Sequence, residues 1–317
     1  MKSVIGVDTS CYTTSIAAVS LEGDLLASDR KLLRVASGRR GLMQSEAVFQ
    51  HVLSLPDRVA AVMDAAGDLQ ICAVAASTRP RPEEESYMPV FRAGESQART
   101  VASLLRVPFY PFSHQEGHVR AALVGTGIRM QDKFLAFHLS GGTTEALVVE
   151  QGKIRLFGGT RDLHAGQLVD RVGVRLGLGF PCGPELEKLA VQAEAKGLLP
   201  VAIRGRDCSI SGAETRLMQL LSQGQLTPEE ASAEVYDFLA RTIARMMETA
   251  IHETGLHQVL LAGGVASSTL FRTLVQERNR KMRLGAELSF ARPELSGDNA
   301  VGIALLGAEA FKKGDKQ

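Results

Sequence analysis

Two histidines four residues apart, in the segment "PFSHQEGHVRAAL", have the spacing that most directly suggests chemistry in this sequence. On a helix, residues i and i+4 share a face, so His114 and His118 could chelate one ion. Glu116 would lie roughly on the opposite side, whereas a zincin protease needs H-E-x-x-H with the glutamate beside the metal. The spacing therefore disfavours a metalloprotease. It leaves two interpretations, a metal-binding pair or two unrelated surface histidines.

A third ligand is available in the segment "PELSGDNAVGIALLGAEAF", where Asp298 precedes an apolar helical stretch. Two imidazoles and a carboxylate suit iron or zinc, and they leave positions open for substrate oxygens. If the pair binds metal, we therefore expect one divalent ion, iron or zinc, held by His114, His118 and Asp298.

Two glycine turns could hold an anion. In "HLSGGTTE", Gly141 and Gly142 allow close approach to the backbone, and Ser140 offers a hydroxyl group. In "LLAGGVASS", residues 260–268, a similar turn follows an apolar strand and opens a helix, as nucleotide-binding turns do. A single Gly-Gly turn can simply join two elements, but two such turns favour a nucleotide. The candidate residues of the second turn are Gly263, Gly264 and Ser268.

Asp170 lies in "HAGQLVDRVGVRLG", among residues whose spacing predicts an apolar helix face. A buried carboxylate needs a partner, and a ribose hydroxyl is one possibility. A helix cap or a surface salt bridge would explain the residue equally well.

The elements that must position these residues include two copies of one strand-turn-strand unit. "SVIGVDTSCYTTSIAAVSLEGDLLA" and "FLAFHLSGGTTEALVVEQGKIRLFG" each predict an apolar strand, a Ser/Thr-rich turn, a second strand and a glycine hairpin. A shift of 130 positions places Val7 on Phe137 and Ser10 on Ser140. Helical periodicity marks "EAVFQHVLSLPDRVAAVMDAAG", "GESQARTVASLLR", "QLVDRVGVRLGL" and the long "PEEASAEVYDFLARTIARMMETAIHETG". "STRPRPEEESYMPVF" is predicted to be a loop.

Duplicated halves of mixed sheet and helices predict an α/β chain with the duplicated, two-lobed fold of the actin, Hsp70 and sugar-kinase superfamily, which has a nucleotide cleft. We expect an N-terminal lobe over residues 1–112 and a second lobe over 113–297. A C-terminal helix at 298–317 is expected to pack back on the first lobe.

Composition narrows the function classes. With 317 residues, 45% hydrophobic and 22% charged, the chain is typical of an ordinary globular protein of roughly two domains. A net charge of +1 argues against indiscriminate nucleic-acid binding. The four cysteines form no CxxC pair, which indicates neither a disulfide framework nor a thiolate zinc site. The N-terminus lacks a signal peptide pattern, and no apolar stretch approaches a membrane span, so we expect a cytoplasmic protein with no membrane partner.

Several segments, taken in this order, resemble the TsaD/Gcp family: "IGVDTSC", "HQEGH", "HLSGGTTE", "AGQLVDRVGVRLGLGFPCGPELEKLA", "ISGAETRL", "LAGGVASS" and "ARPELSGDNAVGIA". The likeness runs from residue 4 to about 310. Proteins of that family transfer a threonylcarbamoyl group from an adenylate to the N6 of the tRNA adenosine that follows the anticodon. The resemblance implies the same fold, the metal ligands named above, and tRNA with family-type partner subunits or a homodimer as partners.

The resemblance also implies contacts with an adenine nucleotide or acyl-adenylate. The implied residues are His138, Leu139, Ser140, Gly141, Gly142, Asp170 and Gly183, with Ser140 and Asp170 as the candidate catalytic positions. By this analogy the ion anchors and polarises the adenylate and does not generate hydroxide.

The sequence departs from the family at positions that matter for the acceptor. Tyr12 and Thr13 replace an acidic pair, Thr143 replaces a histidine and Ser268 an asparagine, while "RPRPEEESYMPVFRAG" replaces a glycine-rich stretch. Two alternatives therefore stay open: carbamoyl or acyl transfer to a non-tRNA acceptor, and a non-catalytic nucleotide-binding paralogue that acts as a partner subunit. Retention of the metal residues speaks against the second alternative.

Overall fold

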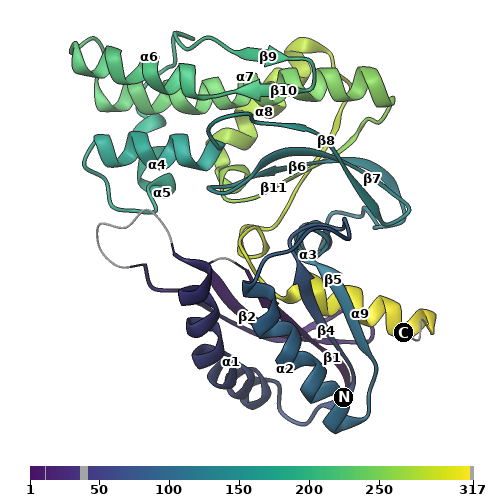
Figure 1. Ribbon diagram of the computed structural model, residues 1–317. Helices are drawn as coiled ribbons and strands as arrows, with labels where there is room; N and C mark the ends of the chain where they lie inside the picture. The colour runs from purple at the N-terminus through teal and green to yellow at the C-terminus, as the bar shows by residue number, and fades with distance from the viewer. Residues whose placement is uncertain (11, 36–41, 315–317) are drawn as a thin grey trace. The chain divides into compact units, whose positions relative to one another are not determined.

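The computed structural model describes residues 1–10, 12–35 and 42–314, so Cys11 and residues 315–317 of the expected C-terminal helix lie outside the described residues. The chain divides into two compact units (Figure 1). Unit 1 comprises Met1–Val124 and Gly297–Gln317, and unit 2 comprises Gly125–Ser296.

Unit 1 is built on a mixed sheet with the strand order β3-β2-β1-β4-β5. β1 pairs antiparallel with β2 and parallel with β4, and β5 continues the parallel half of the sheet. The strands are β1 (Lys2–Thr9), β2 (Thr13–Ser20), β3 (Leu25–Leu32), β4 (Gln70–Arg79) and β5 (Phe109–Ser113).

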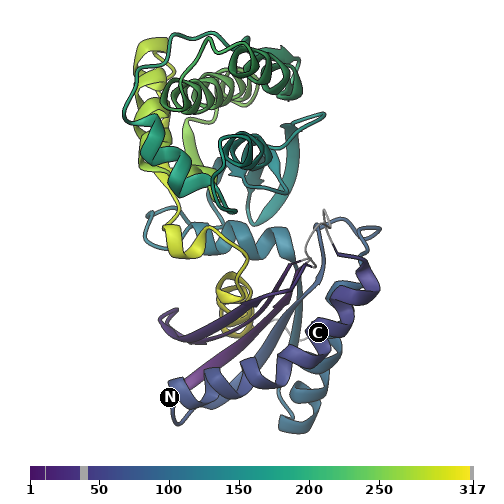
Figure 2. The same cartoon turned by 90° about the vertical axis from the view of Figure 1, so that its left-hand side faces the viewer.

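Helices cover both faces of this sheet (Figure 2). α1 (Gln44–Ala66) and α2 (Val90–Leu105) pack on the face where Val7 joins a buried apolar cluster. α9 (Val301–Lys313) packs on the other face, where a Cβ at Gly6 would lie 2.6 Å from a backbone nitrogen of α9. Because side chains alternate along a strand, β1 turns its apolar residues to both layers.

Unit 2 repeats the strand order of unit 1. Its sheet runs β12-β11-β6-β7-β8, with β6 antiparallel to β7 and parallel to β11. Val7 pairs with Ile16 in the first hairpin and Phe137 with Ala146 in the second, which confirms the shift of 130 positions in the pairing register itself. The strands are β6 (Lys133–Leu139), β7 (Thr144–Glu150), β8 (Lys153–Gly159), β11 (Gln258–Ala262) and β12 (Glu287–Phe290).

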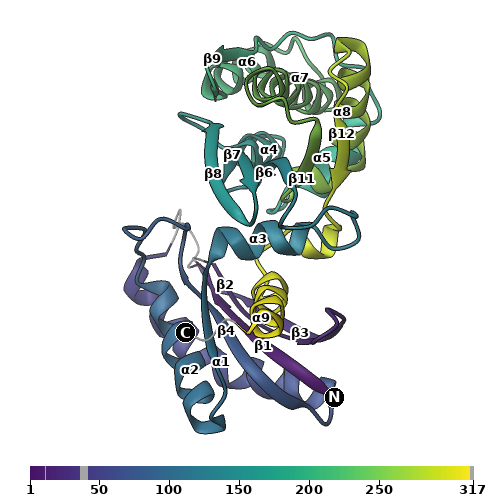
Figure 3. The same cartoon turned by 90° about the vertical axis from the view of Figure 1, so that its right-hand side faces the viewer.

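Figure 3 shows the helices of unit 2 beside its sheet. The side chains of these helices and of the sheet form one apolar core. Leu135 and Phe137 of β6 are buried in the same cluster as Phe238 of the long α7. A short hairpin, β9 (Ala202–Arg204) with β10 (Asp207–Ser209), precedes α6. The helices are α4 (Ala165–Arg175), α5 (Gly183–Ala190), α6 (Ser211–Ser222), α7 (Pro228–Thr254) and α8 (Thr269–Met282).

Two boundaries differ from the sequence expectation. The chain divides after Val124 and not after residue 112, because α3 (His114–Ala122) packs against α9 within unit 1. α2 begins at Val90, ahead of the predicted start at Gly94, because Val90 and Phe91 are buried. Within the described residues, the helices include none with the length and apolar character needed to span a membrane.

Candidate functional site

Both histidines stand on α3, whose first residue is His114. Ser113 caps this helix: its Oγ accepts the N–H of Glu116 at 3.2 Å, and the Glu116 carboxylate accepts the Ser113 N–H at 2.6 Å. This reciprocal capping box fixes the residue at which the helix begins. It also accounts for the glutamate between the histidines, whose carboxylate is engaged in capping.

α3 crosses α9 at two glycines. A Cβ at Gly302 would collide with the carbonyl oxygen of Gly117, and a Cβ at Gly117 would lie 2.8 Å from the Cδ1 of Ile303. Without side chains at these positions, the two helices can approach closely. Since Asp298 lies shortly before α9, this crossing brings its carboxylate to the two histidines.

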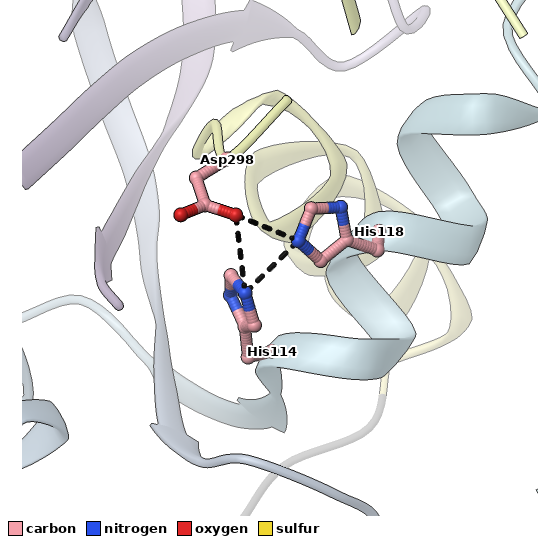
Figure 4. A group of neighbouring side chains, drawn as sticks. All are labelled: His114, His118 and Asp298. Atoms are coloured by element: carbon pink, nitrogen blue, oxygen red, sulfur yellow. Dashed lines mark hydrogen bonds and ion pairs between the residues drawn. The ribbon is translucent and has the colours of Figure 1, made fainter. Parts of the chain in front are cut away.

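The three candidate ligand atoms form a triangle (Figure 4). His118 Nε2 lies 2.9 Å from His114 Nε2 and 3.1 Å from Asp298 Oδ1, and His114 Nε2 lies 3.6 Å from that oxygen. The side chains of His114, His118 and Asp298 are 20%, 11% and 30% exposed. The ligand atoms are therefore largely desolvated, yet the group still opens to solvent.

The triangle fits a first-row metal ion. A circle through points with these separations has a radius of about 1.9 Å, slightly less than the 2.0–2.2 Å typical of metal–nitrogen and metal–carboxylate bonds. A point at bonding distance from all three atoms therefore exists just off their plane. Two imidazoles and one carboxylate on one side of an ion are typical of non-haem iron and of zinc sites that keep positions open.

The charges of the group are coupled. Burial disfavours the charged ring of His114, but the carboxylates of Asp8 and Asp298 outweigh this effect and raise the pKa of His114 well above its ordinary value. Burial would also raise the pKa of Asp298, but hydrogen bonds from both histidines hold it well below its ordinary value. The group thus concentrates negative charge that a proton or a metal ion can neutralise.

Asp8, at the end of β1, orients the first histidine. Its Oδ1 lies 2.9 Å from His114 Nδ1, and its side chain is 0% exposed. With Nδ1 bound to this carboxylate, the ring presents Nε2 to the metal position. A carboxylate on the outer nitrogen of a metal-bound histidine commonly fixes the ring and increases its basicity.

His51, on α1, holds the third ligand indirectly. The buried ring donates Nε2–H to the carbonyl of Ser10 at 2.8 Å, and Nδ1 lies 2.8 Å from the Thr14 hydroxyl. Burial lowers the pKa of His51, so the ring is neutral and Nδ1 accepts from the hydroxyl. Ser10 Oγ in turn donates to Asp298 Oδ2 at 2.8 Å. Sequence reasoning missed Asp8, Ser10 and His51. Asp8 could have been found, because it is a carboxylate near the end of an otherwise apolar strand.

Replacing Asp8 with alanine is expected to weaken metal binding about 10- to 100-fold, the usual effect of removing an outer-shell partner, because His114 is then free to rotate. Competition with a chelator, followed by titration with zinc or ferrous ion, measures this change. Thr242→Ala is the matched control, since Thr242 is a buried residue of α7 in unit 2 whose hydroxyl has no partner within the described residues. Equal affinities in the two variants would contradict the orienting role.

The two glycine turns lie side by side in unit 2. β6 and β11 are parallel neighbours with Ala262 opposite His138, so the turns that follow them leave the sheet at the same edge. In the first turn, Ser140 Oγ accepts the N–H groups of Thr143 at 3.0 Å and Gly142 at 3.3 Å. The serine hydroxyl therefore shapes the turn.

The glycines of these turns fall into two groups. Gly263 has φ +98° and a Cβ there would strike the carbonyl of Leu139, so the fold itself requires glycine. Gly141, Gly142 and Gly264 have no positive φ, and a Cβ at each would meet nothing within 4 Å. Because the chain does not need glycine at these three positions, close approach of a ligand is a reason for glycine there.

Asp170, on α4, holds the chain just before α5. Its Oδ1 accepts the N–H of Cys182 at 2.9 Å, and burial raises the pKa of its carboxyl group. Gly183 begins α5, and its carbonyl accepts the hydroxyl of the buried Tyr236 at 3.0 Å. Within the described residues, a hydrogen bond engages only Oδ1 of Asp170, and the ribose contact expected from the sequence stays a prediction.

The three remaining candidate residues, Leu139, His138 and Ser268, lie within or at the ends of regular elements of unit 2. Leu139 is fully buried in the core of unit 2, while the half-buried His138 precedes it in β6. Ser268 caps α8 by accepting the N–H of Phe271 at 3.1 Å and is only 8% exposed. The structure therefore gives Ser268 a capping role at the position where the family usually has asparagine.

Comparisons with known proteins agree with this architecture. A ROK family glucokinase from Streptomyces griseus, 14% identical, covers 97% of this chain and 99% of its own at a TM-score of 0.55. This similarity confirms the expected duplicated α/β fold.

The family is shown by sequence. Residues 36–305 match the model of the family described as TsaD, tRNA N6-adenosine threonylcarbamoyltransferase. A relative of that name from Thermus thermophilus is 34% identical over 98% of this chain and 94% of its own length. A probable bifunctional tRNA threonylcarbamoyladenosine biosynthesis protein from Methanothermobacter thermautotrophicus is 29% identical over 97% of this chain and 56% of its own length. This chain belongs to the TsaD family.

Proposed function

We propose that this protein transfers a threonylcarbamoyl group from threonylcarbamoyl-adenylate to the N6 of a tRNA adenosine. The observation that carries the proposal is the His114, His118 and Asp298 triangle, which has metal-binding geometry in a chain that belongs to the TsaD family. A non-catalytic partner subunit would have no use for such a group.

A divalent iron or zinc ion held by His114, His118 and Asp298 would supply Lewis-acid stabilisation of charge on the acyl oxygen. The chain's own residues do the remaining work. Asp8 orients His114, and Ser10 orients Asp298.

In unit 2, the proposed nucleotide site is the pair of glycine turns. The backbone at Gly141 and Gly142 would bind phosphate, and Asp170 would accept a hydrogen bond from a ribose hydroxyl. Ser140 keeps the turn in shape for this contact. Since the adenylate is already activated, positioning and charge stabilisation are the main demands on the protein.

A second candidate is transfer to an acceptor other than tRNA. Glu83, Glu84 and Glu85 are all exposed, in the segment that replaces the family's glycine-rich stretch. A phosphate backbone that passed this segment would meet a row of negative charge, and each such repulsion is modest and screened by salt. This observation favours a smaller or less acidic acceptor.

Incubation of the purified protein with threonylcarbamoyl-adenylate and total tRNA, followed by nucleoside mass spectrometry, tests the proposal. We expect threonylcarbamoyl-adenosine from the wild-type protein and none from the His118→Ala control, which excludes a contaminating transferase. Unmodified tRNA with intact adenylate would overturn the activity. Consumption of adenylate over the buffer rate without modified tRNA would favour the second candidate.

Partners are part of the proposal. The bifunctional name of one relative suggests that members of this family work with further domains, so we propose a family-type partner subunit or a second copy of this chain. A cytoplasmic location follows from tRNA as the substrate.

A further inference from the structure

One arginine of unit 1 lacks the partner that its burial calls for. Among the described arginines of this unit, those that are partly buried are Arg58, Arg79 and Arg120. Arg58 pairs with Asp29 at 2.5 Å and Arg120 with Glu309 at 2.6 Å. No described carboxylate pairs with Arg79. Its Nε is buried without a hydrogen-bond partner, as is the Nε of Arg58, but Arg58 has Asp29 as a counter-ion.

A partly buried guanidinium group without a counter-ion lowers the stability of the folded protein. The group stays charged at every pH relevant to proteins, so it cannot relieve the cost by losing a proton. A buried donor without an acceptor costs more than an ordinary hydrogen bond contributes, and a charged donor costs more still. An anionic ligand is the natural partner for such a group.

Arg79 is the last residue of β4, close to the metal-binding helix. In the sheet it pairs with Ser113, the residue immediately before His114. The carbonyl of the following Pro80 accepts the N–H of Gln115 in the first turn of α3 at 3.0 Å. The backbone at Arg79 is therefore fixed against the start of the helix that carries both histidines.

Two further polar atoms near the ends of β1 and β4 have no partner. Asp8 Oδ2 and Ser77 Oγ are buried and unpaired within the described part of the chain. Val7 lies opposite Ala76 in the sheet, so the residues that follow them, Asp8 and Ser77, lie on neighbouring strands. Buried polar atoms without a partner call for an explanation such as an ordered water or an ion nearby.

We propose that Arg79 binds the threonine carboxylate of the acyl-adenylate beside the metal centre. The inference rests on the proposed function, because it takes the adenylate as the ligand. It adds a specificity-determining residue in the segment where this chain departs from its family. A guanidinium matches carboxylate and phosphate with two parallel hydrogen bonds, which orients the bound group as well as attracting it.

The test uses calorimetry on the full-length wild-type protein, Arg79→Gln and the control Arg81→Gln, which removes one exposed positive charge two residues away. The probes are AMP and an adenylate analogue whose phosphate is replaced by an uncharged amide linker, made as the free threonine acid and as its methyl ester. Charge-assisted hydrogen bonds lead us to expect that Arg79→Gln binds the free threonine acid about 10- to 100-fold more weakly than the wild type does.

Weaker binding of the acid but not the ester assigns the threonine carboxylate. Weaker binding of AMP with unchanged binding of the acid would contradict the carboxylate assignment. The inference is overturned if Arg79→Gln binds every probe like the wild type, if it loses acid and ester equally, or if Arg81→Gln shows the same losses. Metal content and Tm are measured on each variant, and a variant that keeps both has lost only the contact. Wild-type protein that binds neither AMP nor the analogue contradicts the proposed function itself.

Discussion

Replacing His118 with alanine is expected to remove bound metal from a protein that stays folded. The His118 Nε2 atom is the one nearest to both other ligand atoms, at 2.9 and 3.1 Å, so its loss leaves a single pair at 3.6 Å. We expect affinity to fall by roughly 100-fold or more, beyond the effect of losing an outer-shell partner. Elemental analysis after dialysis measures the metal content.

Glu116→Ala is the control for this experiment, because it alters the same helix turn without touching the ligand atoms. It removes half of the capping box and costs about 1 kcal/mol of stability. Metal content should remain at the wild-type level. If His118→Ala retains as much metal as Glu116→Ala, the metal site is not at this triangle.

Replacing Gly141 with valine is expected to weaken AMP binding at least about tenfold while Tm changes little. A Cβ at this position meets no protein atom within 4 Å and requires no unfavourable φ. Any cost therefore comes from crowding the phosphate. Calorimetry with AMP, together with thermal unfolding of the same preparation, measures both quantities.

Gly263→Val is the contrasting variant, since its side chain would strike the Leu139 carbonyl at a positive φ. We expect this change to destabilise unit 2 outright. The pair therefore separates a glycine kept for a ligand from one kept for the fold. Unchanged AMP affinity in a folded Gly141→Val protein would place the nucleotide elsewhere.

The repeated hairpin could be predicted because its signals lie within short segments of sequence. These signals are the pattern of apolar residues in each strand and the residue types of each turn. The shift that aligns Val7 with Phe137 needed only comparison of two segments, and the structure pairs both strands in that register. The i, i+4 spacing of His114 and His118 was likewise local, since α3 forms from residues adjacent in sequence.

The residues that orient the candidate metal ligands could not be predicted from the sequence, because their contacts join positions that are far apart in the chain. His114 meets Asp8 across 106 positions, and His51 meets the Ser10 carbonyl across 41. Neither contact leaves a periodic pattern, and a buried histidine in an amphipathic helix looks like any core residue. The capping role of Ser268 was missed for the opposite reason: the family comparison drew attention to a ligand where a local helix signal sufficed.

The crossing of α3 and α9 joins two segments that are made at very different times during synthesis. His118 and Asp298 are 180 positions apart, and all of unit 2 is encoded between them. The ribosome therefore completes the glycine turns of the second unit before it supplies the last ligand. A chain interrupted ahead of residue 298 can contain both glycine turns but never the triangle. Metal bound at the proposed triangle would therefore distinguish chains that extend past residue 298 from shorter ones.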